Sequence, residues 1–299
     1  MSNVSTTSKK GVQQLLSSPS VQEKLKEILG KRASTFATSV VQITQSNTML
    51  ATAEPNSIVG AAMTAATLNL PLNNSLGYAY IIPFNTKNPD GTKSVKASFQ
   101  IGYKGFIQLA MRSGQFKTIH TSLVKEGEIA SRDRLSGVID FNWIDNDIER
   151  EGRKTIGYVA YFRLLNGYEA TLFMSIDELN AHGKKFSKTF GNQYGLWKTD
   201  FDSMASKTVI KLLLSKYAPL SIDMQTAVQT DQASFNDAEN TEDISYIDNE
   251  EVKHDPDEER IVLLIQGAKT QEDLDFAKGH ASEKHLDLIK AKQKELNKK

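Results

Sequence analysis

The sequence contains no cysteine. That absence excludes disulfide bonds and thiolate metal ligands. No apolar run approaches the roughly 20 residues that a membrane-spanning helix needs, and the first residues contain no apolar core of a secretory signal peptide. We therefore expect a cytoplasmic protein with no membrane partner.

Motifs of nucleotide-driven and hydrolytic enzymes are also missing. The pairs Gly30-Lys31 and Gly183-Lys184 are followed by basic residues, whereas a phosphate-binding P-loop requires Ser or Thr at that position. The histidines do not have the spacing of a zinc-binding HExxH motif, and no nucleophile elbow is present. We predict no catalytic residue and no metal site.

One carboxylate cluster keeps an enzymatic alternative open. Asp145, Asp147, Glu149 and Glu151 alternate after a strand pattern, and a metal-dependent nuclease needs clustered carboxylates. Arg150 stands where a calcium-binding EF-hand loop would have its glycine. The pattern is more typical of a solvated strand end or hairpin loop.

The net charge is zero overall, but the two parts of the chain differ. Residues 1–226 contain 26 Lys and Arg against 18 Asp and Glu, whereas residues 227–299 contain 10 against 18. A basic body indicates a polyanionic partner, and an acidic tail indicates a separate role.

Hydropathy patterns predict an α+β fold, in which a small antiparallel sheet with a β-hairpin packs against several helices. Alternating apolar residues predict strands at 78–84, 95–101, 117–124, 138–144, 155–165 and 168–174. Helical patterns predict one helix that begins at Pro19 and three more at 34–46, 57–69 and 199–217. Ser175 and Glu178 fit a capping box for a further short helix.

Composition divides the chain into four parts. We expect a disordered N-terminus at 1–16, a folded core at 17–226, an acidic flexible linker at 227–257 and a small helical module at 258–299. The linker prediction depends on the stretch 226–260, which carries 12 Asp and Glu against Lys253 and Arg260.

The stretch 100–115 joins a strand pattern to a helix pattern. Lys104, Gln108 and Arg112 are four residues apart and therefore share one polar helix face, with apolar residues such as Phe106 opposite. Four residues advance a helix by about 6 Å, which is close to the spacing of phosphates along a nucleic-acid strand. The alternative is an ordinary solvated helix face.

These residues belong to longer motifs. The motifs read Leu76-Gly77-Tyr78-Ala79-Tyr80, Pro83-Phe84-Asn85, Gly102-Tyr103-Lys104-Gly105, Leu109-Ala110 and Arg112-Ser113-Gly114, followed by Trp197, Met204, Lys207-Thr208, Lys211 and Lys216-Tyr217-Ala218-Pro219. Over about residues 20–225 the chain resembles the RecT/Redβ-type phage single-strand annealing proteins, the RecT family in particular.

The resemblance implies ATP-independent binding of single-stranded DNA and annealing of complementary strands in phage-type homologous recombination, by a homo-oligomeric filament or ring. It implies single strands and the annealed duplex as ligands, and a phage or prophage origin in a bacterial host. No cofactor is required, and Mg²⁺ is expected at most to modulate DNA binding. Such proteins work beside an exonuclease, and we expect the C-terminal module to recruit that nuclease or a single-strand binding protein. The alternatives are a protein that passively protects single strands and the metal-dependent nuclease.

The expected site is a basic groove in which cations from distant parts of the chain converge. Cations that neutralise phosphates allow two strands to approach each other, and aromatic rings can stack on bases. The predicted DNA-binding residues are Lys96, Tyr103, Lys104, Gln108, Arg112, Lys117, Lys185, Lys198, Lys207 and Lys211.

Overall fold

The computed structural model divides the chain into two compact units, residues 1–249 and 250–299. The structure describes residues 11–87, 92–193, 195–237, 244–246, 265, 268, 270–279, 289 and 292–293. Among these residues no helix is long and apolar enough to cross a lipid bilayer.

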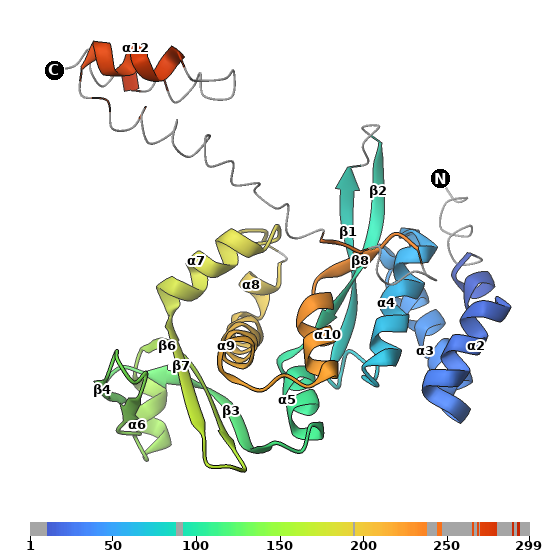
Figure 1. The fold of residues 1–299 in the computed structure, drawn as a ribbon, viewed down its shortest axis with the longest axis horizontal. Helices are drawn as coiled ribbons and strands as arrows, with labels where there is room; N and C mark the ends of the chain where they lie inside the picture. The colour runs from blue at the N-terminus through green and yellow to red at the C-terminus, as the bar shows by residue number, and fades with distance from the viewer. Residues whose placement is uncertain are drawn as a thin grey trace. The chain divides into compact units, whose positions relative to one another are not determined.

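The strands of the described residues form three antiparallel sheets, which confirms the α+β prediction (Figure 1). The hairpin sheet has the order β1 (Ala79–Lys87), β2 (Lys93–Ile101), β8 (Ala233–Phe235) and β9 (Ile244–Tyr246). The central sheet has the order β3 (Phe116–Lys125), β6 (Thr155–Leu164) and β7 (Glu169–Ser175). A small two-stranded sheet pairs β4 (Ile129–Arg132) with β5 (Ile139–Phe141).

Helices surround both larger sheets. In the first unit they are α2 (Pro19–Leu29), α3 (Ala33–Ser46), α4 (Pro55–Thr67), α5 (Tyr103–Arg112), α6 (Asp147–Gly152), α7 (Ile176–Phe186), α8 (Leu196–Thr199), α9 (Phe201–Tyr217) and α10 (Ile222–Thr230). Ser175 and Glu178 form the predicted capping box at the start of α7.

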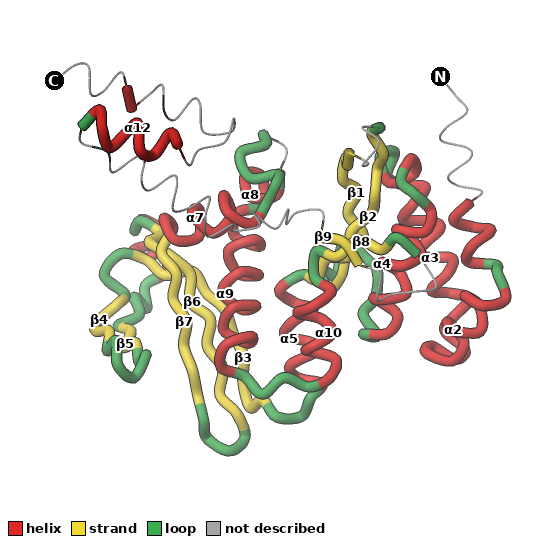
Figure 2. Tube along the Cα trace, turned by 45° about the horizontal axis from the view of Figure 1, so that its top comes forward, coloured by secondary structure: helices red, strands yellow, loops and turns green. Residues whose placement is uncertain are grey.

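Helix α9 lies between the central sheet and α5, and it packs against both (Figure 2). Period-2 alternation places Ala160 and Phe162 of β6 in the core, and both are fully buried. The hairpin sheet packs on α4, whose small residues allow a close approach. A Cβ added at Gly60 of α4 would lie 2.4 Å from Cβ of Phe235 in β8.

Two predicted boundaries are wrong. Residues 11–16 are helical rather than disordered, because Val12 and Leu16 bury apolar side chains in the core. The acidic linker does not begin at residue 227, since β8 pairs with β2 and buries Phe235 completely. Composition missed both segments because a few apolar residues are enough to anchor a short polar stretch.

The second unit contains α12 (Gln271–Gly279). Its first turn is capped reciprocally: the Thr270 N–H donates to Asp273 at 2.9 Å, and the Asp273 N–H donates to the Thr270 hydroxyl at 3.1 Å. Most of the remainder of the predicted helical module, 258–299, lies outside the described residues.

Candidate nucleic-acid interface

The glycines of the central stretch allow two backbone segments to touch. A Cβ added at Gly102 would lie 2.2 Å from the carbonyl oxygen of Gly77, and one at Gly105 would lie 2.2 Å from that of Tyr78. Gly77 itself has φ +74°, a left-handed conformation that favours glycine. The segment before β1 is therefore pressed against the first turn of α5, and this contact explains the glycines in both motifs.

The first turn of α5 gathers a lysine and two tyrosines. Lys104 is exposed, with Nζ 6.0 Å from the ring centre of Tyr103. Burial raises the pKa of the Tyr80 phenol, and the nearby Asp200 and Tyr103 raise it further. The N-cap, Gly102, provides no side-chain hydrogen bond, and the first turn contains no acidic residue. The positive end of the helix dipole and Lys104 therefore both favour an anion here.

Lys198 is exposed on α8. Its neighbour Trp197 is buried and packs edge-on against Phe190 at 5.8 Å and Phe201 at 5.7 Å between ring centres. Asp200, two residues further along, lies near enough to Tyr80 to raise its pKa. The aromatic contacts of Trp197 therefore hold α8 against the start of α9 and fix the position of Lys198 on it.

Lys207 and Lys211 bond to a carboxylate inside the protein instead of facing solvent side by side. Lys207 Nζ lies 2.8 Å from Asp231 Oδ1, and Lys211 Nζ lies 2.7 Å from Asp231 Oδ2. The Ile101 N–H also donates to Asp231 Oδ1, at 3.0 Å. The prediction that Lys207 is an exposed phosphate ligand is wrong, because its side chain is 10% exposed and neutralises a buried acid.

Lys211 retains partial access, with 26% of its side chain exposed. Burial lowers the pKa of His182, and the charges of Lys211 and Lys185 lower it further. Lys185 is exposed on the last turn of α7, with Nζ 5.2 Å from the ring centre of Phe186. Lys185 at the end of α7 and Lys211 of α9 thus both act on His182.

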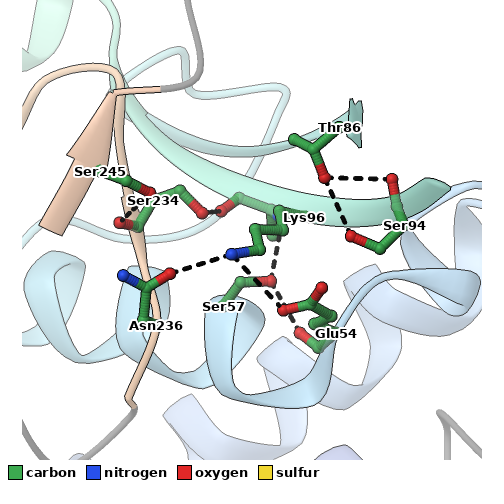
Figure 3. Close-up of polar contacts among 9 residues, drawn as sticks. Glu54, Ser57, Thr86, Ser94, Lys96, Ser234, Asn236 and Ser245 are labelled. Carbon is green, nitrogen blue, oxygen red and sulfur yellow. Dashed lines mark hydrogen bonds and ion pairs between the residues drawn. The ribbon is translucent and has the colours of Figure 1, made fainter. Parts of the chain in front are cut away.

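Two further predicted ligands hold the fold together. Figure 3 shows Lys96 of β2 reaching Asn236 at 2.9 Å and Glu54, at the start of α4, at 3.9 Å. Arg112 donates to the carbonyl oxygens of Leu68 at 2.6 Å and Asn69 at 3.2 Å, where it satisfies the C-terminal end of α4. Both cations have intramolecular partners, and their assignment as DNA ligands stays a prediction.

The remaining predicted residues lie on different surfaces. Gln108 is exposed, but it lines a pocket with Arg112 near the end of α4 rather than the first turn of α5. Lys117 is exposed at the start of β3. For the proposal below we group the cations at or near the first turn of α5, α7, α8 and α9 with two tyrosines and call this set the α5 basic surface: Tyr80, Tyr103, Lys104, Lys185, Lys198 and Lys211.

Sequence reasoning missed Asp231, which joins α9, α10 and β2. Its position in an acidic stretch suggested a solvated linker, and no local signal identifies a carboxylate whose partners lie 20, 24 and 130 residues away. Among the described residues no group of three or more His, Cys, Asp or Glu is arranged to hold a metal ion, so the nuclease alternative gains no support from the acidic cluster after β5. Instead, Asn146 caps the short helix α6 through the N–H groups of Ile148 and Glu149.

Comparison with known proteins identifies the family of this chain. Residues 34–246 match the RecT family. The chain is 44% identical over 215 residues to the uncharacterized protein YqaK of Bacillus subtilis strain 168, covering 72% of this chain and 69% of that protein. It is 34% identical over 177 residues to Protein RecT of Escherichia coli K12, covering 59% of this chain and 62% of RecT. The chain therefore belongs to the RecT family, a family of phage-type recombination and annealing proteins.

Proposed function

We propose that the chain binds single-stranded DNA on the α5 basic surface and anneals complementary strands without ATP, as a homo-oligomer. The observation that carries this proposal is the first turn of α5, where Lys104 and two tyrosines surround an uncapped helix N-terminus. Lys198 extends the positive charge onto α8, and Lys185 and Lys211 extend it toward α7 and α9.

The mechanism follows from charge and stacking. Lysines that neutralise phosphates remove the repulsion that keeps two complementary strands apart. Tyrosine rings at the same surface can hold bases by stacking, which tolerates any sequence. Copies of the chain placed side by side would extend this surface along a strand and leave base edges free to pair.

Asp231 has a supporting role in this proposal. It binds both α9 lysines and the N–H of Ile101, one residue before the N-cap of α5. The buried acid therefore fixes α9 relative to the first turn of α5. Lys207 contributes to binding through this arrangement rather than by touching phosphate.

The wider biological setting is part of the proposal. We place the protein in the cytoplasm of a bacterial host, as the product of a phage or prophage. We propose that residues 250–299, the second compact unit, recruit an exonuclease or a single-strand binding protein. Mg²⁺ would modulate DNA binding without being a required cofactor.

Fluorescence annealing of complementary oligonucleotides tests the proposal directly. The full chain should accelerate pairing in the absence of ATP, with Mg²⁺ and with EDTA. Binding of single strands without faster pairing would identify a passive protecting protein. Shortening of the oligonucleotides when Mg²⁺ is added would identify a nuclease, and replacing Asp145 and Asp147 by Asn would then abolish the cleavage.

A further inference from the structure

Residues 126–153 form a separate insertion between two strands of the central sheet. This acidic insertion contains β4, β5 and α6. Its residues Ile129, Ile139 and Phe141 pack against a small cluster of sheet residues, Val124, Val159 and Phe173. Inside it, Arg150 binds the buried Glu128 at 2.5 Å and the Leu123 carbonyl oxygen at 2.9 Å. The insertion is therefore internally fixed, although little of it is in the main core.

Several large apolar side chains of the acidic insertion are exposed to solvent. Leu135 is 96% exposed, Ile148 85%, Val138 53% and Trp143 43%. Trp143 is held in place by stacking on Phe141, with ring centres 4.7 Å apart. Several exposed apolar residues on one small element are typical of a protein interface rather than of free surface.

The charge of the acidic insertion selects a basic partner. Residues 126–153 carry eight Asp and Glu against four Arg. Asp145, Asp147, Glu149 and Glu151 are all exposed, at or beside the short helix that carries Ile148. A nucleic-acid backbone would be repelled here, so this surface fits a protein.

A complementary pocket lies at the other end of the first unit. It has a volume of about 540 Å³ and is lined by apolar residues of α2, α3 and the segment after α4, including Leu29, Phe36 and Leu76. Arg32 and Arg112 add positive charge to its lining. Residues 11–46 carry four Lys and Arg against two Glu. Figure 1 places β4 and α6 at one end of this unit and α2 at the opposite end, and Figure 2 shows the same separation between β4 and α2.

We propose that the acidic insertion of one copy docks in this N-terminal pocket of a second copy. Apolar side chains would fill an apolar pocket, and exposed carboxylates would face Arg32. The two surfaces are different and lie at opposite ends, so the contact is heterologous: each copy offers a free insertion and a free pocket to the next, which builds rings or filaments. This inference rests on the proposed function, since it supplies the assembly that annealing uses.

The docking leaves the α5 basic surface open. Gln108 and Arg112 of α5 line the pocket, as does Leu76, whereas Lys104 and Tyr103 on the first turn of α5 do not. A helix of ten residues spans about 15 Å. Successive copies would therefore each present Lys104 beside the contact rather than inside it.

Complementation between two disabled variants tests this contact. The insertion variant is Leu135→Asp with Ile148→Asp, and the pocket variant is Leu76→Asp with Arg32→Glu, both in the full chain. In sedimentation velocity, the association constant of each variant alone should be at least about ten-fold lower than that of the parent. The reason is that burying one unpaired charge costs more free energy than a ten-fold change in that constant represents. Mixed in equal amounts, they should form a dimer and stop, because one intact insertion then meets one intact pocket.

A control variant and three outcomes decide whether the contact exists. Leu165→Asp is the matched control, since Leu165 is 68% exposed but lies in the turn between β6 and β7; it should assemble like the parent. Circular dichroism must show each variant folded. A mixture that stays monomeric, variants that assemble like the parent, or a monomeric parent would each overturn the contact. If the parent failed to anneal complementary strands, the proposed function would be wrong, but the sedimentation experiment would still test the contact between copies.

Discussion

Lys207 Nζ and Asp231 Oδ1 lie 2.8 Å apart, and both side chains are almost completely removed from solvent. Lys211 completes the arrangement from the next turn of α9. A buried acid with one lysine on each oxygen and a backbone N–H donor is fully paired, and such networks fix one arrangement of the elements that carry them. Here those elements are α9, the end of α10 and the strand that leads into α5.

Asp231→Ala should destabilise the protein by about 3–5 kcal/mol, because it leaves a buried ammonium group without its partner. The measurement is urea unfolding followed by circular dichroism. Lys216→Ala, an exposed position on the same helix, should change the free energy of unfolding by less than about 0.5 kcal/mol. Equal effects of the two substitutions would show that the buried pair does not hold α9 in place.

Stability should also depend on acid pH through Asp231. The two lysines lower its pKa to about 2 from a usual 3.8, against the opposing effect of burial. A depressed folded-state pKa stabilises the protein above the unfolded-state pKa, so the contribution is complete above about pH 4 and is lost as the pH falls toward 2. Asp231→Asn should make the free energy of unfolding less dependent on pH between about pH 4 and pH 2. Urea titrations at a series of pH values measure this dependence.

Lys104→Ala and Lys198→Ala should each weaken single-strand binding equally for all sequences. Loss of one phosphate contact should lower the slope of log K against log salt by about 0.7. Fluorescence anisotropy at several salt concentrations gives the slope. Lys154→Ala is the control, because Lys154 is exposed next to the acidic insertion; a slope change as large as that for Lys104→Ala would contradict the assignment.

Gly105→Ala should destabilise the fold by about 1–3 kcal/mol or more, since its added Cβ would lie 2.2 Å from a backbone carbonyl oxygen that cannot move aside cheaply. Gly152→Ala offers a contrast, because a Cβ there meets nothing within 4 Å and Gly152 ends α6 with an ordinary backbone. That change should be neutral or slightly stabilising. Thermal unfolding of the two variants measures the difference.

Local patterns were enough for most of the fold. Alternation in 155–165 predicted β6 within a residue of its end, and the spacing of Lys104, Gln108 and Arg112 predicted three exposed positions on α5. Short strands were harder: β8 has three residues, and it forms because Phe235 finds the space left by Gly60 of α4. The three residues of β8 contain no pattern that predicts this space beside Gly60.

The sequence by itself determined the longer strands, the polar face of α5, the lack of cysteine chemistry and the separation of basic from acidic charge, because each depends on neighbouring residues. Only the tertiary structure decided which cations face solvent. Lys104 and Lys207 are equivalent in the sequence, yet one is exposed and the other meets Asp231 in the interior. The difference depends on contacts between residues far apart in the chain. Counting charges along the sequence cannot detect it, because each lysine counts as one positive charge.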